Sequence, residues 1–560
     1  MKLLKKFLGR ADIVIPPVLL LVITYFVYMP MVLFLGNIDE FLVDFSKVAP
    51  LIVAVSIAAF LILAAVGFML VWEKASRVYT TLIFGIALGF YVQGNFLNPD
   101  FGVMNGSDIP WEDYTTASVI SAAAWVVCIV APQVLLFFKK NVAAAVMKWG
   151  SYLLCAMQIV ALVTTILTTK KTASSEFGLV KKDEFTLSSK ENIVVFVVDT
   201  LDTAYYEEMI ESDAAYESHL SDFTYYDNCV AGGAPTILGV PMMLTGKSYD
   251  DLSQGLFEYI ESAYDESTLF KDLKANNYRT SLFTDYLNVT GLNPSEVDNM
   301  AETDEYVIAD KKGFIKEIYK LGSFYSMPTL LKRYFWFYSG DFAKYVKLKG
   351  IDYDLYKLDD HQFYSDYKEQ GITTQENENV FAYYHLVGAH PPHTVDENLE
   401  IITDGSGTKT RQTKGVFNMI FKFIDEMKAK GIYDSSTIII TGDHGEQQLF
   451  QSPAVLVKKK NSHKEYTTNS APVMFTNLRA TFASEFMDDY SSYGENLEDV
   501  PENDSRERYH TTHIIHQNVV DDKDAKDSVF SRFCFTGKTK DMDKYKVVDT
   551  SNNPKKNSGQ

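Results

Sequence analysis

The first third of the chain is dominated by long apolar runs. Five of them are long enough for membrane-spanning helices, which need about 20 apolar residues each. They lie near 13–36, 49–72, 79–97, 116–138 and 147–168. Beyond about residue 170 the pattern is mixed and polar. The sequence therefore predicts a transmembrane anchor of about five helices over 1–170, followed by a polar linker at 171–191.

From residue 192 short apolar runs of β type alternate with helical patterns. This alternation predicts an α/β domain over 192–490 with a mostly parallel central sheet. Within it, 299–372 is rich in Tyr, Phe and Lys and is interpreted as a helical insertion. Over 491–560 the pattern predicts a small antiparallel β appendage and a disordered tail.

Charge is distributed unevenly along the chain. The net charge is −20, yet the first 150 residues contain ten Lys and Arg against nine Asp and Glu. The acidity thus lies in the later part, which argues against nucleic-acid binding. Basic residues cluster at 1–10, 73–77 and 139–148, whereas the intervening loops are acidic. The positive-inside rule then predicts a multi-pass cell-membrane protein whose later domain is extracytoplasmic.

Two apolar runs end in acidic residues. TIIITGDHGE at 437–446 leads into Asp443 and His444, and NIVVFVVDT at 192–200 leads into Asp199. Open α/β folds place their ligands at the carboxyl edge of the sheet. Carboxylate and imidazole together suit a borderline-to-hard divalent cation. These residues are candidate metal ligands, although Asp-His-Gly also forms an ordinary turn after a strand.

A glycine-rich segment between the two acids carries a candidate nucleophile. In NCVAGGAPTILGVPMMLTG, residues 228–246, Pro235 precedes Thr236 at the start of a predicted helix. A hydroxyl at a helix N-terminus lies where backbone N–H groups favour anions. In contact with a metal it becomes a nucleophile at neutral pH. The alternative is that Thr236 only caps the helix.

These motifs, with HLVGAHPP at 385–392, resemble in their order the alkaline phosphatase/sulfatase superfamily. The resemblance covers about 190–490. It is greatest to the membrane-anchored lipoteichoic acid synthase and phosphoethanolamine transferase branches, which also have five-span anchors and an external catalytic domain. It implies a sulfatase-type fold and a metal bound by Asp199, Thr236, Asp443 and His444.

The resemblance also implies roles in catalysis and substrate binding. Thr236 takes the position of the nucleophile, and His390 that of a histidine contacting the substrate phosphate or the leaving group. His385, the first histidine of that segment, is a candidate for substrate binding. Arg411 is a further candidate for binding a phosphate, with a solvated charge at a helix start as the alternative.

The chain departs from the sulfatase pattern in ways that bear on its chemistry. Sulfatases carry Cys or Ser in a C/S-x-P-x-R motif, whereas this chain has Thr236-Ile-Leu-Gly-Val. The second acid of sulfatases is replaced by Thr200, with Asp202 nearby, and His463 is only a loose further candidate. The cofactor expected is one divalent ion (manganese, magnesium or zinc), with a second ion left open.

Three functions are compatible with these motifs. The first is a phosphoglycerol or phosphoethanolamine transferase that moves a group from a membrane lipid donor to a surface glycan or polyol acceptor. The second is a sulfuric-ester or phosphoric-ester hydrolase of the same superfamily. The third is a non-catalytic surface protein that uses the fold for binding. The missing Cys and Arg and the anchor favour the first.

Overall fold

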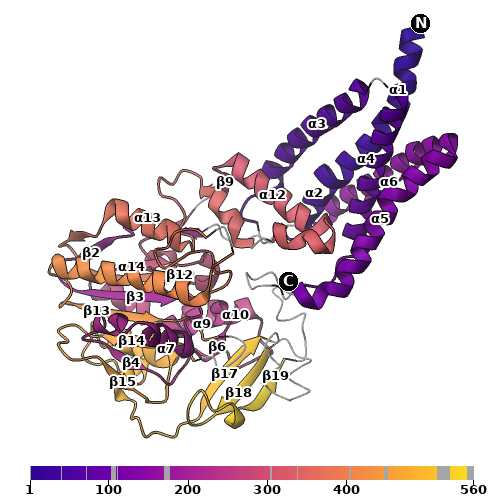
Figure 1. Ribbon diagram of the computed structural model, residues 1–560. Coiled ribbons are helices and arrows are strands. Elements are labelled where there is room, and N and C mark those ends of the chain that lie inside the picture. The colour runs from indigo at the N-terminus through magenta and orange to yellow at the C-terminus, as the bar shows by residue number, and fades with distance from the viewer. Residues whose placement is uncertain are drawn as a thin grey trace. The chain divides into compact units, whose positions relative to one another are not determined.

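The computed structural model describes residues 2–38, 41–70, 72–101, 109, 111–169, 177–302, 306–336, 339–402, 405–446, 452–513 and 530–551. The chain forms two compact units (Figure 1). The helical unit comprises Met1–Glu176 and Thr303–Gly350, and the sheet unit comprises Phe177–Glu302 and Ile351–Gln560. The region expected as an insertion in the later domain therefore clusters largely with the N-terminal helices.

The helical unit contains five stretches long and apolar enough to cross a membrane: Arg10–Gly36, Phe45–Met69, Glu73–Phe96, Trp111–Phe138 and Lys140–Thr168. Many of their large apolar side chains are exposed, as expected of helix faces that contact lipid. The five helices predicted from the apolar runs are thus confirmed. Their elements are α1 (Lys2–Leu21), the π-helix η1 (Val22–Tyr28), α2 (Met29–Gly36), α3 (Phe45–Met69), α4 (Glu73–Phe96), η3 (Trp111–Tyr114), α5 (Thr115–Phe138) and α6 (Lys140–Thr168).

The segment 303–350 adds short elements to the helical unit. Strands β9 (Tyr306–Ile308) and β10 (Val346–Leu348) pair antiparallel near its two ends. Between them lie α12 (Lys311–Ser326) and the 3₁₀ helices η6 (Thr329–Phe335) and η7 (Ser339–Tyr345).

The sheet unit is built on a seven-stranded sheet in the order β15-β4-β14-β13-β3-β12-β7. Strands β13, β3, β12 and β7 are mutually parallel, and β14 pairs antiparallel with β13 and β4. The strands are β15 (Thr467–Asn469), β4 (Thr224–Tyr226), β14 (Val455–Lys458), β13 (Ser436–Thr441), β3 (Asn192–Val198), β12 (Asn379–Leu386) and β7 (Tyr278–Phe283). The prediction of a mostly parallel central sheet is confirmed.

Helices cover both faces of this sheet, which explains the uninterrupted apolar sequence of its central strands. Every residue of β3 is buried. Alternate residues of β3 point into two apolar clusters. One cluster includes α9 (Thr236–Thr245), α10 (Leu256–Glu266), α11 (Leu269–Ala275) and α15 (Phe475–Ala483). The other includes α7 (Thr203–Ser212), α8 (Ala215–Ser218), α13 (Asp360–Gln370) and α14 (Lys409–Ala429).

A second sheet connects the C-terminal strands to the segment before α9. Strands β17 (Arg508–His513), β18 (Phe530–Phe535) and β19 (Lys546–Thr550) are antiparallel, and β17 also pairs in parallel with β6 (Gly233–Ala234). The remaining strand pairs are β1 (Phe177–Leu179) with β8 (Met300–Glu302), β2 (Thr186–Ser188) with β11 (Thr373–Gln375), and β5 (Cys229–Val230) with β16 (Val473–Met474). Short 3₁₀ turns complete the unit: η4 (Tyr286–Val289), η5 (Pro294–Glu296), η8 (Ser491–Tyr493), η9 (Leu497–Asp499) and η11 (Met542–Lys544).

Candidate metal and nucleophile site

Strand register brings the two strand-end acids to one place. Val197 of β3 pairs with Thr441 of β13, so Asp199 and Asp443, each two residues further on, leave the sheet at the same level. His385 of β12 pairs with Val197 from the other side. The three side chains therefore lie at the carboxyl edge of the sheet, where folds of this class bind ligands.

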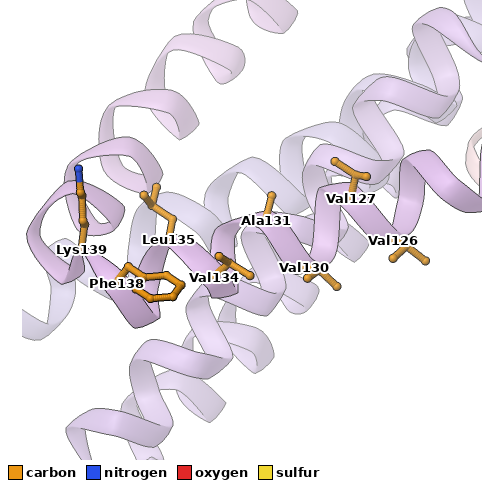
Figure 2. Close-up of a pocket in the computed structure, with 8 residues that line it drawn as sticks. All are labelled: Val126, Val127, Val130, Ala131, Val134, Leu135, Phe138 and Lys139. Atoms are coloured by element: carbon orange, nitrogen blue, oxygen red, sulfur yellow. The ribbon is translucent and has the colours of Figure 1, made fainter.

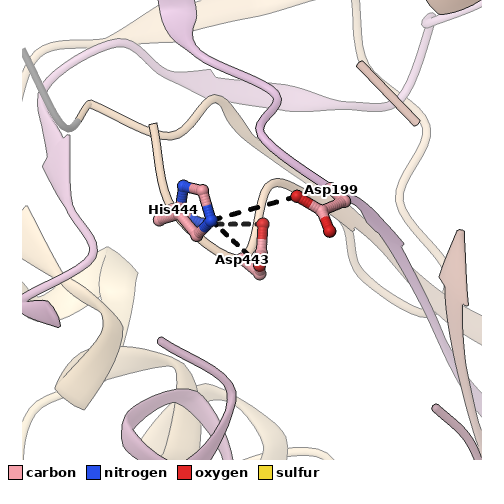
Figure 3. A group of neighbouring side chains, drawn as sticks. All are labelled: Asp199, Asp443 and His444. Atoms are coloured by element: carbon pink, nitrogen blue, oxygen red, sulfur yellow. Dashed lines mark hydrogen bonds and ion pairs between the residues drawn. The ribbon is translucent and has the colours of Figure 1, made fainter. Parts of the chain in front are cut away.

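Asp199, Asp443 and His444 form a buried cluster (Figure 3). One potential ligand atom from each lies within 4.8 Å of the others. The Nε2 atom of His444 is 3.4 Å from Asp443 Oδ2 and 3.9 Å from Asp199 Oδ1. The His444 Nδ1 atom is 2.8 Å from the Gly445 carbonyl oxygen, which fixes the ring orientation and directs Nε2 toward the acids.

The cluster has the properties of a divalent-cation site. Asp443 Oδ2 is buried and has no hydrogen-bond partner, which is costly unless a cation or another donor satisfies it. Two carboxylates and one imidazole nitrogen are ligands suited to manganese, magnesium or zinc. Among the described residues, this is the one group of His, Cys and acidic side chains spaced to hold a metal ion.

Thr236 is the first residue of α9, and its hydroxyl faces the cluster. Its Oγ1 atom lies 3.4 Å from His444 Nε2. Gly239, one turn later, makes this approach feasible, because a Cβ atom there would lie 2.1 Å from the Asp443 carbonyl oxygen. The structure thus brings the predicted nucleophile to the predicted metal ligands.

Thr200 links both acids of the cluster. Its backbone N–H donates to Asp443 Oδ1 at 2.9 Å, and its hydroxyl donates to Asp199 Oδ1 at 2.7 Å. Its φ angle of 59° is unusual for a β-branched residue and marks a strained backbone at the site. Sequence reasoning noticed Thr200 only as a missing acid and overlooked this role.

His385 lies beside Asp199. Its Nε2 atom is 3.7 Å from Asp199 Oδ2, and its Nδ1 atom is 2.9 Å from the Thr284 hydroxyl. Burial alone would lower the pKa of His385, but the neighbouring acids, Asp199 foremost, raise it above its usual value. Burial alone would raise the pKa of Asp199, but the charge of His390 and the contacts with His385 and His444 lower it. Asp199 is therefore held as a carboxylate.

His390 lies on a loop that polar side chains hold in place. The side-chain oxygens of Asp360 accept hydrogen bonds from the backbone N–H groups of Val387 and Gly388, both at 2.8 Å. The amide of Gln412 donates to the carbonyl oxygens of Gly388 and His390 at 2.9 and 3.0 Å. Gly388 has a φ of 62°, and a Cβ atom there would clash with Asp199 N at 2.5 Å. Asp360 and Gln412 carry no motif that would have identified them in the sequence.

The remaining candidates have other partners in the described structure. Arg411 Nε donates to Glu397 Oε2 at 2.7 Å. Asp202 caps α7 and accepts from the backbone of Glu446 at 2.9 Å. His463 is exposed. Phosphate binding by Arg411 and a second metal thus stay predictions.

A groove of about 570 Å³ lies elsewhere, along α5 in the helical unit (Figure 2). Its lining is apolar except for one cation: Val126, Val127, Val130, Ala131, Val134, Leu135, Phe138 and Lys139. It contains no acid, histidine or nucleophile, so its chemistry is that of a helix face that contacts lipid.

Comparisons with known proteins give one family match and several similar solved structures. The sulfatase family model matches residues 191–465. No curated protein matches the chain. Similar solved structures include a phosphonate monoester hydrolase from Silicibacter pomeroyi, with 11% identity, a TM-score of 0.36, and 64% of this chain and 88% of that chain covered. The lipoteichoic acid synthase LtaP from Listeria monocytogenes has 12% identity, a TM-score of 0.35, and coverage of 66% and 89%. An alkaline phosphatase superfamily protein from Vibrio parahaemolyticus has 10% identity, a TM-score of 0.37, and coverage of 67% and 85%.

Proposed function

We propose that the chain, whose residues 191–465 match the sulfatase family model, is a metal-dependent phosphoryl-group transferase of the sulfatase superfamily. The observation that carries this proposal is the Thr236 hydroxyl at the helix N-terminus, 3.4 Å from His444 Nε2. A hydroxyl in this position can form a covalent phosphoester.

The nearest thiol does not offer a sulfatase-type alternative. Cys229 lies seven positions before Thr236 and is fully buried in β5. Burial raises the pKa of its thiol to about 12. Cys229 therefore lacks both the exposure and the thiolate character of a reactive cysteine, which favours Thr236 as the nucleophile.

The transfer proceeds in two steps. A divalent ion bound by Asp199, Asp443 and His444 would lower the pKa of the Thr236 hydroxyl and neutralise a phosphoryl oxygen. The Thr236 oxygen attacks phosphorus as its proton passes to solvent, and the P–O bond to the donor breaks. His390 gives a proton to the departing oxygen. An acceptor hydroxyl then attacks the phosphothreonine and releases Thr236.

The anchor supports a lipid as donor. The helical unit has five candidate membrane spans, and the basic residues near their ends include Lys139, Lys140 and Lys148. With these at the cytoplasmic face, the end of α6 and the sheet unit lie outside the cell. We propose that the site takes a phosphoglycerol or phosphoethanolamine group from an envelope phospholipid and gives it to a surface glycan or polyol.

The proposal is tested by mass spectrometry of the Thr236 peptide. The full chain, loaded with manganese, is exposed to a membrane lipid extract and digested. We expect an adduct with the mass of a phosphoglycerol or phosphoethanolamine group on Thr236, and none in the Thr236→Ala variant. Full turnover of the lipid by Thr236→Ala would refute the mechanism. Preferential release of sulfate from an aryl sulfate would favour the hydrolase instead.

A further inference from the structure

The segment 303–350 attaches the chain to the helical unit a second time. The chain leaves the sheet unit after Glu302 and re-enters it at Ile351. Between these points α12 is amphipathic, with Phe314, Ile318 and Leu321 buried on one side. None of the described residues of this segment belongs to the metal cluster of Asp199, Asp443 and His444.

A hydrogen bond to the first membrane helix fixes α12. Pro30 has no N–H, so the carbonyl of Phe26, four residues earlier, loses its helical donor, and the helix around it is a π-helix. The Tyr319 hydroxyl donates to this oxygen at 3.0 Å, whereas the Ser56 hydroxyl, also 3.0 Å away, lies closer to the Ile52 carbonyl at 2.7 Å. An unsatisfied carbonyl is expensive in an apolar surrounding, so Tyr319 makes α12 a structural part of the helix bundle.

Further contacts place this segment at one end of the bundle. The Tyr25 and Ser323 hydroxyls are 2.6 Å apart. The backbone N–H of Thr329 donates to Ser121 Oγ at 3.0 Å, and Ser121 donates to Gln93 Oε1 at 2.6 Å. Gln93 lies in the last turns of α4 and Ser121 near the start of α5. Since successive spans alternate in direction, this is also the end at which α6 finishes.

The 3₁₀ helix η6 is held on one side and exposed on the other. Lys332 is buried and donates to the carbonyl oxygens of Phe324 and Tyr325 in the last turn of α12. Leu330, Leu331 and Tyr334 are 53%, 40% and 69% exposed. The guanidinium of Arg333 lies 5.2 Å from the centre of the Tyr334 ring.

We propose that η6 is a membrane-interface segment that rests in the outer phospholipid leaflet. Two leucines, a tyrosine and an arginine on one short exposed surface are the composition of segments that bind at the lipid–water boundary. The buried side of η6, through Thr329, is held against α5, whose neighbouring faces are those of a lipid-contacting helix. Leu330 and Leu331 enter the acyl boundary, Tyr334 lies at headgroup level, and Arg333 pairs with lipid phosphate.

The proposal does not depend on the transferase activity. Its consequence is that the sheet unit is joined to a bilayer-bound element at residues 302 and 351 as well as through the linker after α6. A segment seated among headgroups and joined by the chain to the sheet unit also suits a lipid substrate, should the proposed function hold.

Nitroxide scanning tests this placement. Single cysteines replace Leu330, Leu331 and Tyr334 in a Cys534→Ser background, because Cys534 is the one native thiol that is not buried. The full chain is reconstituted in phosphatidylglycerol/phosphatidylcholine vesicles. Collision rates with oxygen, which partitions into lipid, and with a polar nickel chelate are measured by electron paramagnetic resonance.

Two further labels bracket the expected result. Val160 on α6 and Ile401 in the sheet unit are 66% and 61% exposed, and they report a lipid-facing and a water-facing site. We expect the oxygen-to-nickel ratio at 331 and 334 to lie severalfold above that at 401 and below that at 160. A ratio equal to that at 401 would overturn the proposal. If the labels are shielded from both oxygen and the nickel chelate, η6 packs against other parts of the protein, and the membrane-interface proposal is overturned as well.

Discussion

At the scale of single residues, Thr200 has two separable contacts with the candidate metal ligands Asp443 and Asp199. Its backbone N–H binds Asp443 whatever the side chain, whereas its hydroxyl alone binds Asp199. Valine matches threonine in shape and in β-branching, so the substitution removes one hydrogen bond without changing the strain at φ 59°.

We predict that Thr200→Val weakens metal binding by roughly 10-fold or more, in the range seen when residues orienting metal ligands are replaced. Isothermal titration with manganese measures this change. Thr200→Ser, which keeps the hydroxyl, serves as the matched control and should bind nearly as the wild type does. Equal affinity of Thr200→Val and wild type would show that the hydroxyl does not orient Asp199.

Asp360 makes a pH-dependent contribution to stability. Burial raises its pKa to about 7, although the N–H groups of Gly388 and Val387 oppose this effect. The folded state therefore keeps a proton that the unfolded chain, with a pKa of about 3.9, has lost. The stabilisation is complete below the unfolded pKa and disappears as the pH rises through about 7.

We predict that the free energy of unfolding of the wild type falls between pH 5 and pH 8 relative to that of Asp360→Asn, which does not titrate. The change should be on the order of 2–3 kcal/mol. Urea denaturation of the detergent-solubilised chain at several pH values gives the difference. A difference that is constant with pH would mean that Asp360 is ionised in the folded protein throughout this range.

At the scale of secondary-structure elements, the first turn of α9 is placed by its closeness to the loop after β13. Gly239 lies so near the Asp443 carbonyl that any side chain requires the helix or the loop to move. Thr236, three residues earlier, would move with the helix and away from His444.

We predict that Gly239→Ala lowers turnover by roughly 100-fold, because small displacements of a nucleophile are costly, and destabilises the chain by about 1–3 kcal/mol. Gly322→Ala in α12 is the control, since no atom lies within 4 Å of the added Cβ. It should be neutral or slightly stabilising. Steady-state kinetics measure the turnover of both variants, and thermal unfolding measures their stability. Wild-type turnover in Gly239→Ala would show that the close approach of Gly239 to the Asp443 carbonyl does not position Thr236.

The strands that carry the site could be predicted because each is buried on both faces and ends in a polar residue. Asp199, Asp443 and His444 follow such strands, so their meeting at the sheet edge was predictable from parallel pairing alone. The position of Thr200 at the site could not be predicted, because its bond to Asp443 joins residues 243 positions apart and depends on a left-handed backbone. Asp360 was missed for a similar reason, because it binds backbone N–H groups, which leave no trace in the sequence of the loop.

At the scale of the whole molecule, sequence reasoning could not show that residues 303–350 belong to the helical unit and not to the sheet unit. An amphipathic helix such as α12 has the same pattern whether its apolar face packs on a globular domain or on membrane helices. The deciding contact is between Tyr319 and the Phe26 carbonyl, whose α-helical donor position is occupied by Pro30. The bond between Thr329 and Ser121 indicates that the segment after α12 packs at the end of the bundle at which α6 finishes.

The orientation of the whole molecule in the membrane gives the last prediction. Lys74 is exposed in the first turn of α4, next to the short connection from α3, whereas Ile401 is exposed on the sheet unit. If basic loops stay inside, an odd number of spans puts these positions on opposite sides. In intact cells that produce the Cys534→Ser chain, a membrane-impermeant maleimide should label Ile401→Cys and leave Lys74→Cys unmodified until the cells are opened.

Labelling of Lys74→Cys alone would place the metal site in the cytoplasm and exclude a surface acceptor. Labelling of both in intact cells would require an even number of spans between them, and so would overturn the assignment of α4, α5 and α6 as three crossings.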